Sequence, residues 1–121
     1  MTILIVDDEQ SIRKLIRVVL EESVDADFLE ASDAAGALKI ATEYQEPIDL
    51  LISDVVMPGQ LNGTEMAAQL FRARPDMKVV VMSGYDPDLL TIRPEWTFIQ
   101  KPFEASEIRE IIGNVLRCGL T

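Results

Sequence analysis

The sequence predicts an α/β fold in which one doubly wound sheet of five parallel strands is covered by helices on both faces. Short β-branched runs alternate with amphipathic stretches along all 121 residues. The first, third and fourth apolar runs are nearly continuous, which is typical of parallel strands buried on both faces. Because connections are short and crossovers between parallel strands are right-handed, five β–α units give a doubly wound sheet.

The elements follow in order along the chain. Strands are expected at residues 3–6, 27–31, 49–53, 77–82 and 97–100. Helices are expected at residues 11–22, after a cap at Ser32 or Asp33, from residues 62–64, and at residues 106–117. Their expected inner faces are Ile12, Leu15, Ile16, Val19 and Leu20; Ala34, Ala37, Leu38 and Ala41; Met66, Leu70 and Phe71; and Ile108, Ile111, Ile112, Val115 and Leu116.

The segment between Gly84 and Trp96 fits the alternating pattern least well. Its only helical material is residues 86–92, and Pro94 disfavours helical backbone at Arg93. We therefore expect a short or irregular fourth helix in this segment.

Length and composition exclude several classes of protein. The chain fits one domain, expected at residues 1–121. It has no apolar run near the roughly 20 residues that cross a bilayer and no signal-peptide features, so we expect a cytoplasmic protein without membrane contact. A formal net charge of −10 argues against nucleic acid as a partner. The chain has no histidine, which excludes an internal histidine base, metal ligand or phosphohistidine.

Polar residues follow four of the apolar runs. Asp7 and Asp8 follow the first, Asp54 the third, Ser83 the fourth and Lys101 the fifth. Each has an ordinary interpretation alone, as a helix cap, a turn residue or a solvated lysine. Because the carboxyl ends of parallel strands meet at one edge, we expect these five side chains to converge.

Such a group of side chains favours phosphoryl chemistry. Three close carboxylates repel one another, and one lysine does not neutralise them. A hard divalent cation such as Mg²⁺ would, because it takes carboxylates, water and phosphate oxygens as ligands. A carboxylate beside Mg²⁺ and lysine can attack a phosphoryl group and form an aspartyl phosphate, while a hydroxyl such as that of Ser83 can donate to a phosphoryl oxygen.

Four motifs resemble the signature of two-component response-regulator receiver domains. They are Ile-Val-Asp7-Asp8-Glu, Ile-Ser-Asp54-Val-Val-Met-Pro-Gly, Val-Met-Ser83-Gly-Tyr and Phe98-Ile-Gln-Lys101-Pro-Phe, in the family's order and spacing. The resemblance covers the whole chain. It implies a flavodoxin-like receiver fold with strand order 2-1-3-4-5 and a cis peptide between Lys101 and Pro102.

The resemblance also implies a role for each site residue. Asp54 would be the phosphoacceptor and a metal ligand, Asp8 a direct Mg²⁺ ligand, and Asp7 would act on the metal mainly through water. The backbone carbonyl of Val56 would be a further metal ligand, and Ser83 and Lys101 would contact the phosphoryl group. The phosphoryl donor would be a histidine kinase or a histidine phosphotransfer protein.

Three residues suggest finer hypotheses. Phe98 occupies the switch position of the family without the hydroxyl of a tyrosine, so we expect a conformational switch through Ser83 and Phe98 that depends on packing. Tyr85 and Val56 are expected to restrict access of water to the aspartyl phosphate. The run from Met57 to Gly63 resembles receivers of hybrid sensor kinases most.

Three other functions fit these residues less well. An aspartyl-nucleophile phosphatase of the haloacid-dehalogenase type needs a second aspartate two residues after the nucleophile, and position 56 is valine. A flavin binder would need a phosphate-binding loop after the first strand, where residues 7–9 are acidic. An interaction module that never receives phosphate would not need the acidic group of residues.

Overall fold

The computed structural model describes residues 1–55, 63–85 and 92–118. Its strands are β1 (Thr2–Val6), β2 (Asp27–Ala31), β3 (Leu50–Asp54), β4 (Lys78–Ser83) and β5 (Thr97–Gln100). They form one parallel sheet in the order β2-β1-β3-β4-β5, as the resemblance implied. The predicted fold class and strand order are therefore confirmed.

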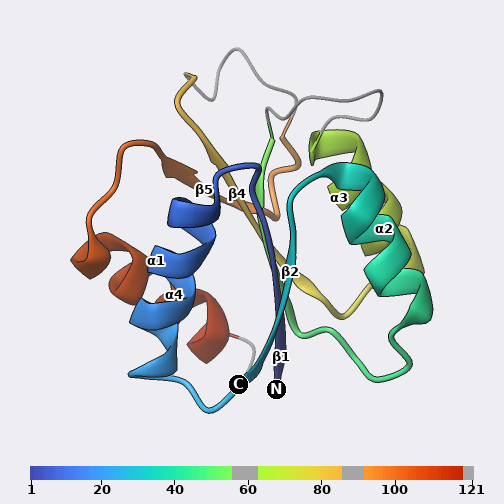
Figure 1. Cartoon of the computed structure of the whole chain (residues 1–121), viewed down its shortest axis with the longest axis horizontal. Helices are drawn as coiled ribbons and strands as arrows, with labels where there is room; N and C mark the ends of the chain where they lie inside the picture. Colours follow the sequence, from blue (N-terminus) through green and yellow to red (C-terminus); the bar gives the residue numbers. More distant parts are fainter. Residues whose placement is uncertain (56–62, 86–91, 119–121) are drawn as a thin grey trace.

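Four helices in the described ranges cover the sheet: α1 (Gln10–Glu21), α2 (Ala34–Glu43), α3 (Gly63–Ala73) and α4 (Ala105–Cys118). Helices α1 and α4 lie on one face, and α2 and α3 lie on the other (Figure 1). The short helix expected at residues 86–92 falls almost entirely outside the described residues. None of the described helices is long and apolar enough to cross a membrane.

The two faces of the sheet bury different side chains. Successive residues of a strand point to opposite faces, so Ile3 and Ile5 pack toward α1 and α4 whereas Leu4 and Val6 pack toward α2 and α3. Isoleucine dominates the first layer, with Ile3, Ile5, Ile16, Ile52, Ile99, Ile108 and Ile112. The second layer is rich in alanine, with Ala31, Ala34, Ala37, Ala41 and Ala67. Both faces are thus covered, as continuous apolar strands require.

One predicted core position is wrong. Leu15 was expected on the inner face of the first helix, but 36% of it is exposed. The stripe through Ile16, Val19 and Leu20 already faces the sheet, and at 3.6 residues per turn Leu15 lies at the margin of that stripe.

Three element boundaries refine the predicted ones, and two of them bear on the site. The cap of α2 is Asp33, whose side chain accepts a hydrogen bond from the Gly36 backbone N–H at 2.7 Å. Strands β3 and β4 each end one residue later than expected, so Asp54 and Ser83 are strand residues. The backbone ladder of the sheet therefore fixes both positions directly.

Candidate phosphoryl-transfer and metal site

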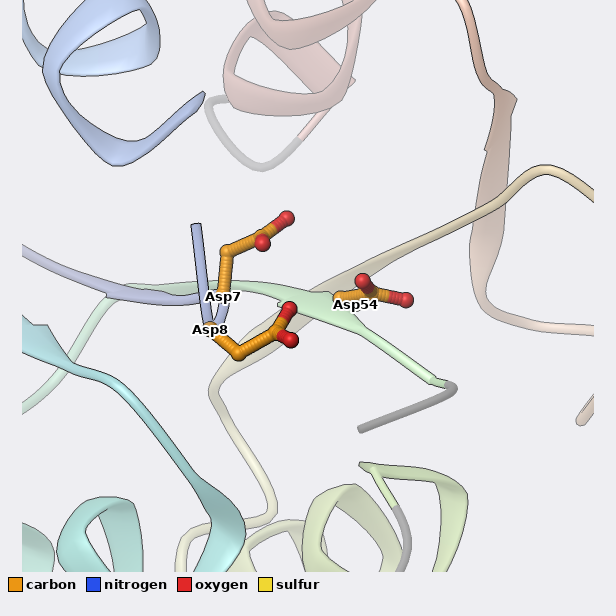
Figure 2. A group of neighbouring side chains, drawn as sticks. All are labelled: Asp7, Asp8 and Asp54. Carbon is orange, nitrogen blue, oxygen red and sulfur yellow. The ribbon is translucent and has the colours of Figure 1, made fainter. Parts of the chain in front are cut away.

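Three aspartates come together at the carboxyl edge of the sheet. In the ladder of β1 and β3, Val6 pairs with Ser53, so Asp7, which directly follows β1, lies beside Asp54, the last residue of β3. Figure 2 shows these two side chains with that of Asp8 next to them. The predicted convergence of strand ends therefore holds for all three carboxylates.

Asp7 is fully buried, with 0% of its surface exposed. Its Oδ1 accepts a hydrogen bond from the Glu9 backbone N–H at 2.9 Å, and its Oδ2 accepts one from Lys101 Nζ at 2.8 Å. Burial raises the pKa of Asp7, and the hydrogen bonds from Lys101 and Glu9 lower it only in part. A buried carboxylate of this kind depends on its hydrogen-bond partners to remain ionised.

Lys101 supplies the positive charge of the site. Its Nζ lies 2.8 Å from Asp7 Oδ2 and 2.9 Å from Asp54 Oδ2, and 18% of its side chain is exposed. Burial alone would lower the pKa of Lys101, but the hydrogen bonds and negative charges of the two carboxylates outweigh burial and raise it. The ammonium is therefore protonated at neutral pH. The peptide between Lys101 and Pro102 is cis, as the resemblance implied.

The three carboxylates fit a small divalent cation. One oxygen each from Asp7, Asp8 and Asp54 lies within 4.8 Å of the others. Two oxygens on opposite sides of a Mg²⁺ ion lie about 4.2 Å apart, so small side-chain rotations would bring this set to a common ion. Lys101 leaves two of the three negative charges uncompensated, and oxygen donors of this charge suit Mg²⁺.

The other predicted site residues lie in different surroundings. Ser83 is 1% exposed, and its Oγ accepts a hydrogen bond from the Tyr85 backbone N–H at 3.0 Å. The Ser83 carbonyl accepts another from the Lys101 backbone N–H at 2.8 Å, which ties these two strand ends together. Tyr85 is 56% exposed, and Phe98 is partly buried against the α2–α3 layer. Val56 lies outside the described residues.

Two residues contact the site in ways that the sequence did not predict. Gly63, at the start of α3, lies directly against the backbone of Asp54 and Val55, and its N–H donates to the Val55 carbonyl at 3.2 Å. Arg13 donates from Nη1 to the Asp7 carbonyl at 2.6 Å. A glycine at a helix start and an arginine on a helix are too common to be singled out from one sequence.

The chain matches one protein family over most of its length. A family model described as the response regulator receiver domain matches residues 3–113. The chain is 30% identical over 119 residues to the sensor kinase CckA of Brucella abortus, covering 95% of the chain and 12% of the relative. It is 28% identical over 120 residues to the chemotaxis protein CheY of Listeria monocytogenes, covering 95% and 98%. The chain spans less than half of several such relatives, including 24% of the NtrC regulator of Rhizobium meliloti.

Solved structures give the same result. The receiver domain of the hybrid histidine kinase CckA is 32% identical with a TM-score of 0.73, and the match covers 96% of this chain and 99% of that one. A response regulator receiver domain protein from Clostridium thermocellum is 29% identical with a TM-score of 0.80, covering 96% and 94%. The similarity to receivers of hybrid kinases, expected from the sequence, is thus present in both comparisons.

Proposed function

The chain belongs to the response regulator receiver domain family, and from this premise we propose that residues 1–121 form one domain that accepts a phosphoryl group on Asp54. Receiver domains are signalling domains that receive phosphoryl groups from histidine kinases or histidine phosphotransfer proteins. The donor would be a phosphohistidine of such a protein, because this chain has no histidine of its own. The supporting observation is that Lys101 Nζ bridges Asp54 and Asp7, with Asp8 within reach of both.

The proposed reaction moves one phosphoryl group between two side chains. A carboxylate oxygen of Asp54 attacks phosphorus, the P–N bond to the donor imidazole breaks, and the electron pair of that bond leaves with the imidazole. The products are an aspartyl phosphate and a free histidine on the donor. The ammonium of Lys101, already 2.9 Å from Asp54 Oδ2, offsets the negative charge of the phosphoryl oxygens.

Magnesium is the metal that we propose for the acidic site. Asp8 and Asp54 would bind it directly, and so would the backbone carbonyl of Val56. Asp7 would act mainly through water, because both of its carboxylate oxygens already accept hydrogen bonds. When bound, the ion would stabilise the negative charge of the transferring phosphoryl group.

A conformational response would follow from phosphorylation. Ser83 would turn its hydroxyl from the Tyr85 N–H toward a phosphoryl oxygen, and Phe98 would move deeper into its partly buried site. The surface around β4 and β5 would then change its affinity for an output partner. A cytoplasmic location belongs to the same proposal, because the kinase that recharges the donor needs a nucleoside triphosphate.

Access of water is proposed to set the lifetime of the aspartyl phosphate. Tyr85 lies two residues beyond Ser83 and is exposed, and we propose that it restricts this access together with Val56. The variant Tyr85→Ala should dephosphorylate faster than wild type when the loss of phosphoprotein is followed by intact mass. An unchanged rate would assign Tyr85 to the surface alone.

The central experiment is phosphorylation of the full chain by a small acyl phosphate, with and without Mg²⁺. We expect intact mass spectrometry to show the addition of one phosphoryl group only when the metal is present. The variant Asp54→Asn should remain unmodified. Asp49→Asn is a matched control, because Asp49 lies just before the opposite end of β3 and binds the Thr2 backbone N–H.

Three outcomes would contradict the proposed function. Wild type could remain unmodified at saturating Mg²⁺, Asp54→Asn could be modified as well as wild type, or modification could be independent of the metal. Repeated hydrolysis of a phosphomonoester substrate would instead indicate a phosphatase. A receiver takes up one phosphoryl group per chain and has no such substrate.

A further inference from the structure

Two arginines of α1 and one glutamate of β2 form a connected group beside the acidic site. Arg13 Nε donates to Glu30 Oε1 at 3.2 Å, and Arg17 Nη1 donates to Glu30 Oε2 at 2.6 Å. Side-chain exposure is 15% for Arg13 and 26% for Glu30, against 41% for Arg17. Glu30 thus holds the guanidinium of Arg13 through Oε1 alone, while Arg17 binds the other oxygen, Oε2.

The contact with Glu30 directs Arg13 at the backbone of Asp7. Its Nη1 donates to the Asp7 carbonyl at 2.6 Å, while the Asp7 N–H donates to the Ala31 carbonyl at 3.2 Å. The carbonyl of Asp7 and the N–H of Asp8 belong to one planar peptide unit. Fixing the carbonyl therefore fixes the direction in which the chain continues to Asp8.

Asp8 depends on this backbone more than Asp7 does. It is exposed, and within the described residues its carboxylate accepts no hydrogen bond. Asp7, in contrast, is held through both carboxylate oxygens as well as its backbone. The peptide between them is the fixed part of the structure next to the proposed metal ligand Asp8.

We propose that Arg13, anchored by Glu30, is a positioning residue that orients the Asp7–Asp8 peptide and thereby the Asp8 carboxylate for a divalent cation. This role rests on the proposed function, since it has no purpose if the site binds no metal. Groups that orient metal ligands commonly contribute about 10- to 100-fold to metal affinity.

Positioning and charge make opposite predictions at this residue. A guanidinium next to the site repels a cation, so its removal would raise Mg²⁺ affinity if charge were its only effect. If Arg13 orients Asp8, its removal lowers affinity because the ligand must be ordered during binding. The sign of the change therefore distinguishes the two roles.

The test is calorimetric titration of the full chain with Mg²⁺, on wild type and three variants. Arg13→Gln should bind about tenfold more weakly. Arg17→Gln removes the same charge from the same helix but leaves the bond to the Asp7 carbonyl, so its affinity should stay within about twofold of wild type. Arg13→Lys keeps the charge without the forked geometry, and its affinity should lie between those of wild type and Arg13→Gln.

A second readout needs no metal. In the ¹⁵N spectrum of the metal-free chain, Arg13→Gln should shift the Asp8 amide resonance more than Arg17→Gln does. Equal or tighter Mg²⁺ binding by Arg13→Gln would overturn the positioning role. If that variant does not fold, wild-type affinity in Arg13→Lys would overturn it equally. Absence of Mg²⁺ binding by wild type would instead contradict the proposed function.

Discussion

Strand β3 is buried along its whole length, but its two halves differ in chemistry. Leu50, Leu51 and Ile52 are 0% exposed, as is Ser53, and Asp54 is 6% exposed. Burying the apolar half is favourable by about 25 cal/mol for each Å² removed from water. Burying a carboxylate is unfavourable unless it is paired. The residues that stabilise the fold and the residue of the proposed function thus occupy opposite halves of one strand.

The neighbouring strands repeat this contrast. Strand β1 passes from Ile5 and Val6 to the buried Asp7, and β4 passes from Met82 to the buried Ser83. The body of the sheet therefore stabilises the fold, and its carboxyl edge carries groups that only a ligand or a partner charge makes favourable. Substitutions in the body and at the edge should separate accordingly in experiment.

The largest effect is expected in the body of the sheet. Ile52→Ala should lower the free energy of unfolding by about 3 kcal/mol, because it removes a fully buried side chain and leaves a cavity. Urea unfolding followed by circular dichroism measures this change. The folded variant should still bind Mg²⁺ like wild type, and a large loss of affinity would show that body and edge are not separate.

Binding of Mg²⁺ at the carboxyl edge of the sheet should have the next largest effect on the free energy of unfolding. Mg²⁺ at about 100 times its dissociation constant should raise the free energy of unfolding by about 2.7 kcal/mol, since only the folded chain assembles the site. Asp8→Asn should lose most of this gain, whereas Ile52→Ala should keep it. Thermal unfolding with and without Mg²⁺ measures both, and an equal gain in Asp8→Asn would exclude Asp8 as a ligand.

Gly63 lies where the body of the sheet meets its carboxyl edge. The variant Gly63→Ala should lower the free energy of unfolding by about 2 kcal/mol. A Cβ at this position would overlap the Asp54 carbonyl oxygen and lie only 2.6 Å from Val55 Cα, and both are backbone atoms that cannot swing aside. Gly63→Ala should also slow phosphorylation, because Asp54 must shift.

Gly113→Ala is the matched control for Gly63→Ala. Among the residues that the structure describes, a Cβ at Gly113 would meet only the side chain of Arg117, at 3.8 Å. Because alanine has a higher helix propensity than glycine, the free energy of unfolding of this variant should rise by up to about 1 kcal/mol. If both variants behaved alike, the close approach at Gly63 would not restrict the site.

Much of this arrangement could be predicted from the sequence, but for different reasons for the strands, the strand order and the side-chain contacts. Continuous runs such as residues 50–52 predict strands because burial on both faces leaves no other pattern. The strand order came from the family resemblance, since periodicity does not specify which strands pair. The contacts of Arg13 with the Asp7 carbonyl and of Gly63 with the backbone of Asp54 and Val55 could not be predicted, because they depend on how closely neighbouring elements approach one another in three dimensions. The exposed position of Leu15 was missed because helical spacing alone does not locate the edge of a buried stripe.

The smallest effect concerns the pH dependence of Asp7 in the metal-free chain. Burial raises the pKa of Asp7 above 3.8, and the hydrogen bond from Lys101 opposes that rise without cancelling it. An acid whose pKa is raised by folding stabilises the fold while protonated, so this contribution is complete below pH 3.8 and is lost as the pH rises through the raised value. Between about pH 4 and pH 7 in EDTA, the free energy of unfolding of wild type should therefore fall relative to that of Asp7→Asn. Urea unfolding of both proteins across this range measures the difference. A constant difference, or one that changes in the opposite direction, would mean that Lys101 stabilises ionised Asp7 more than burial penalises it, so that the buried edge of the sheet would be favourable even without a metal.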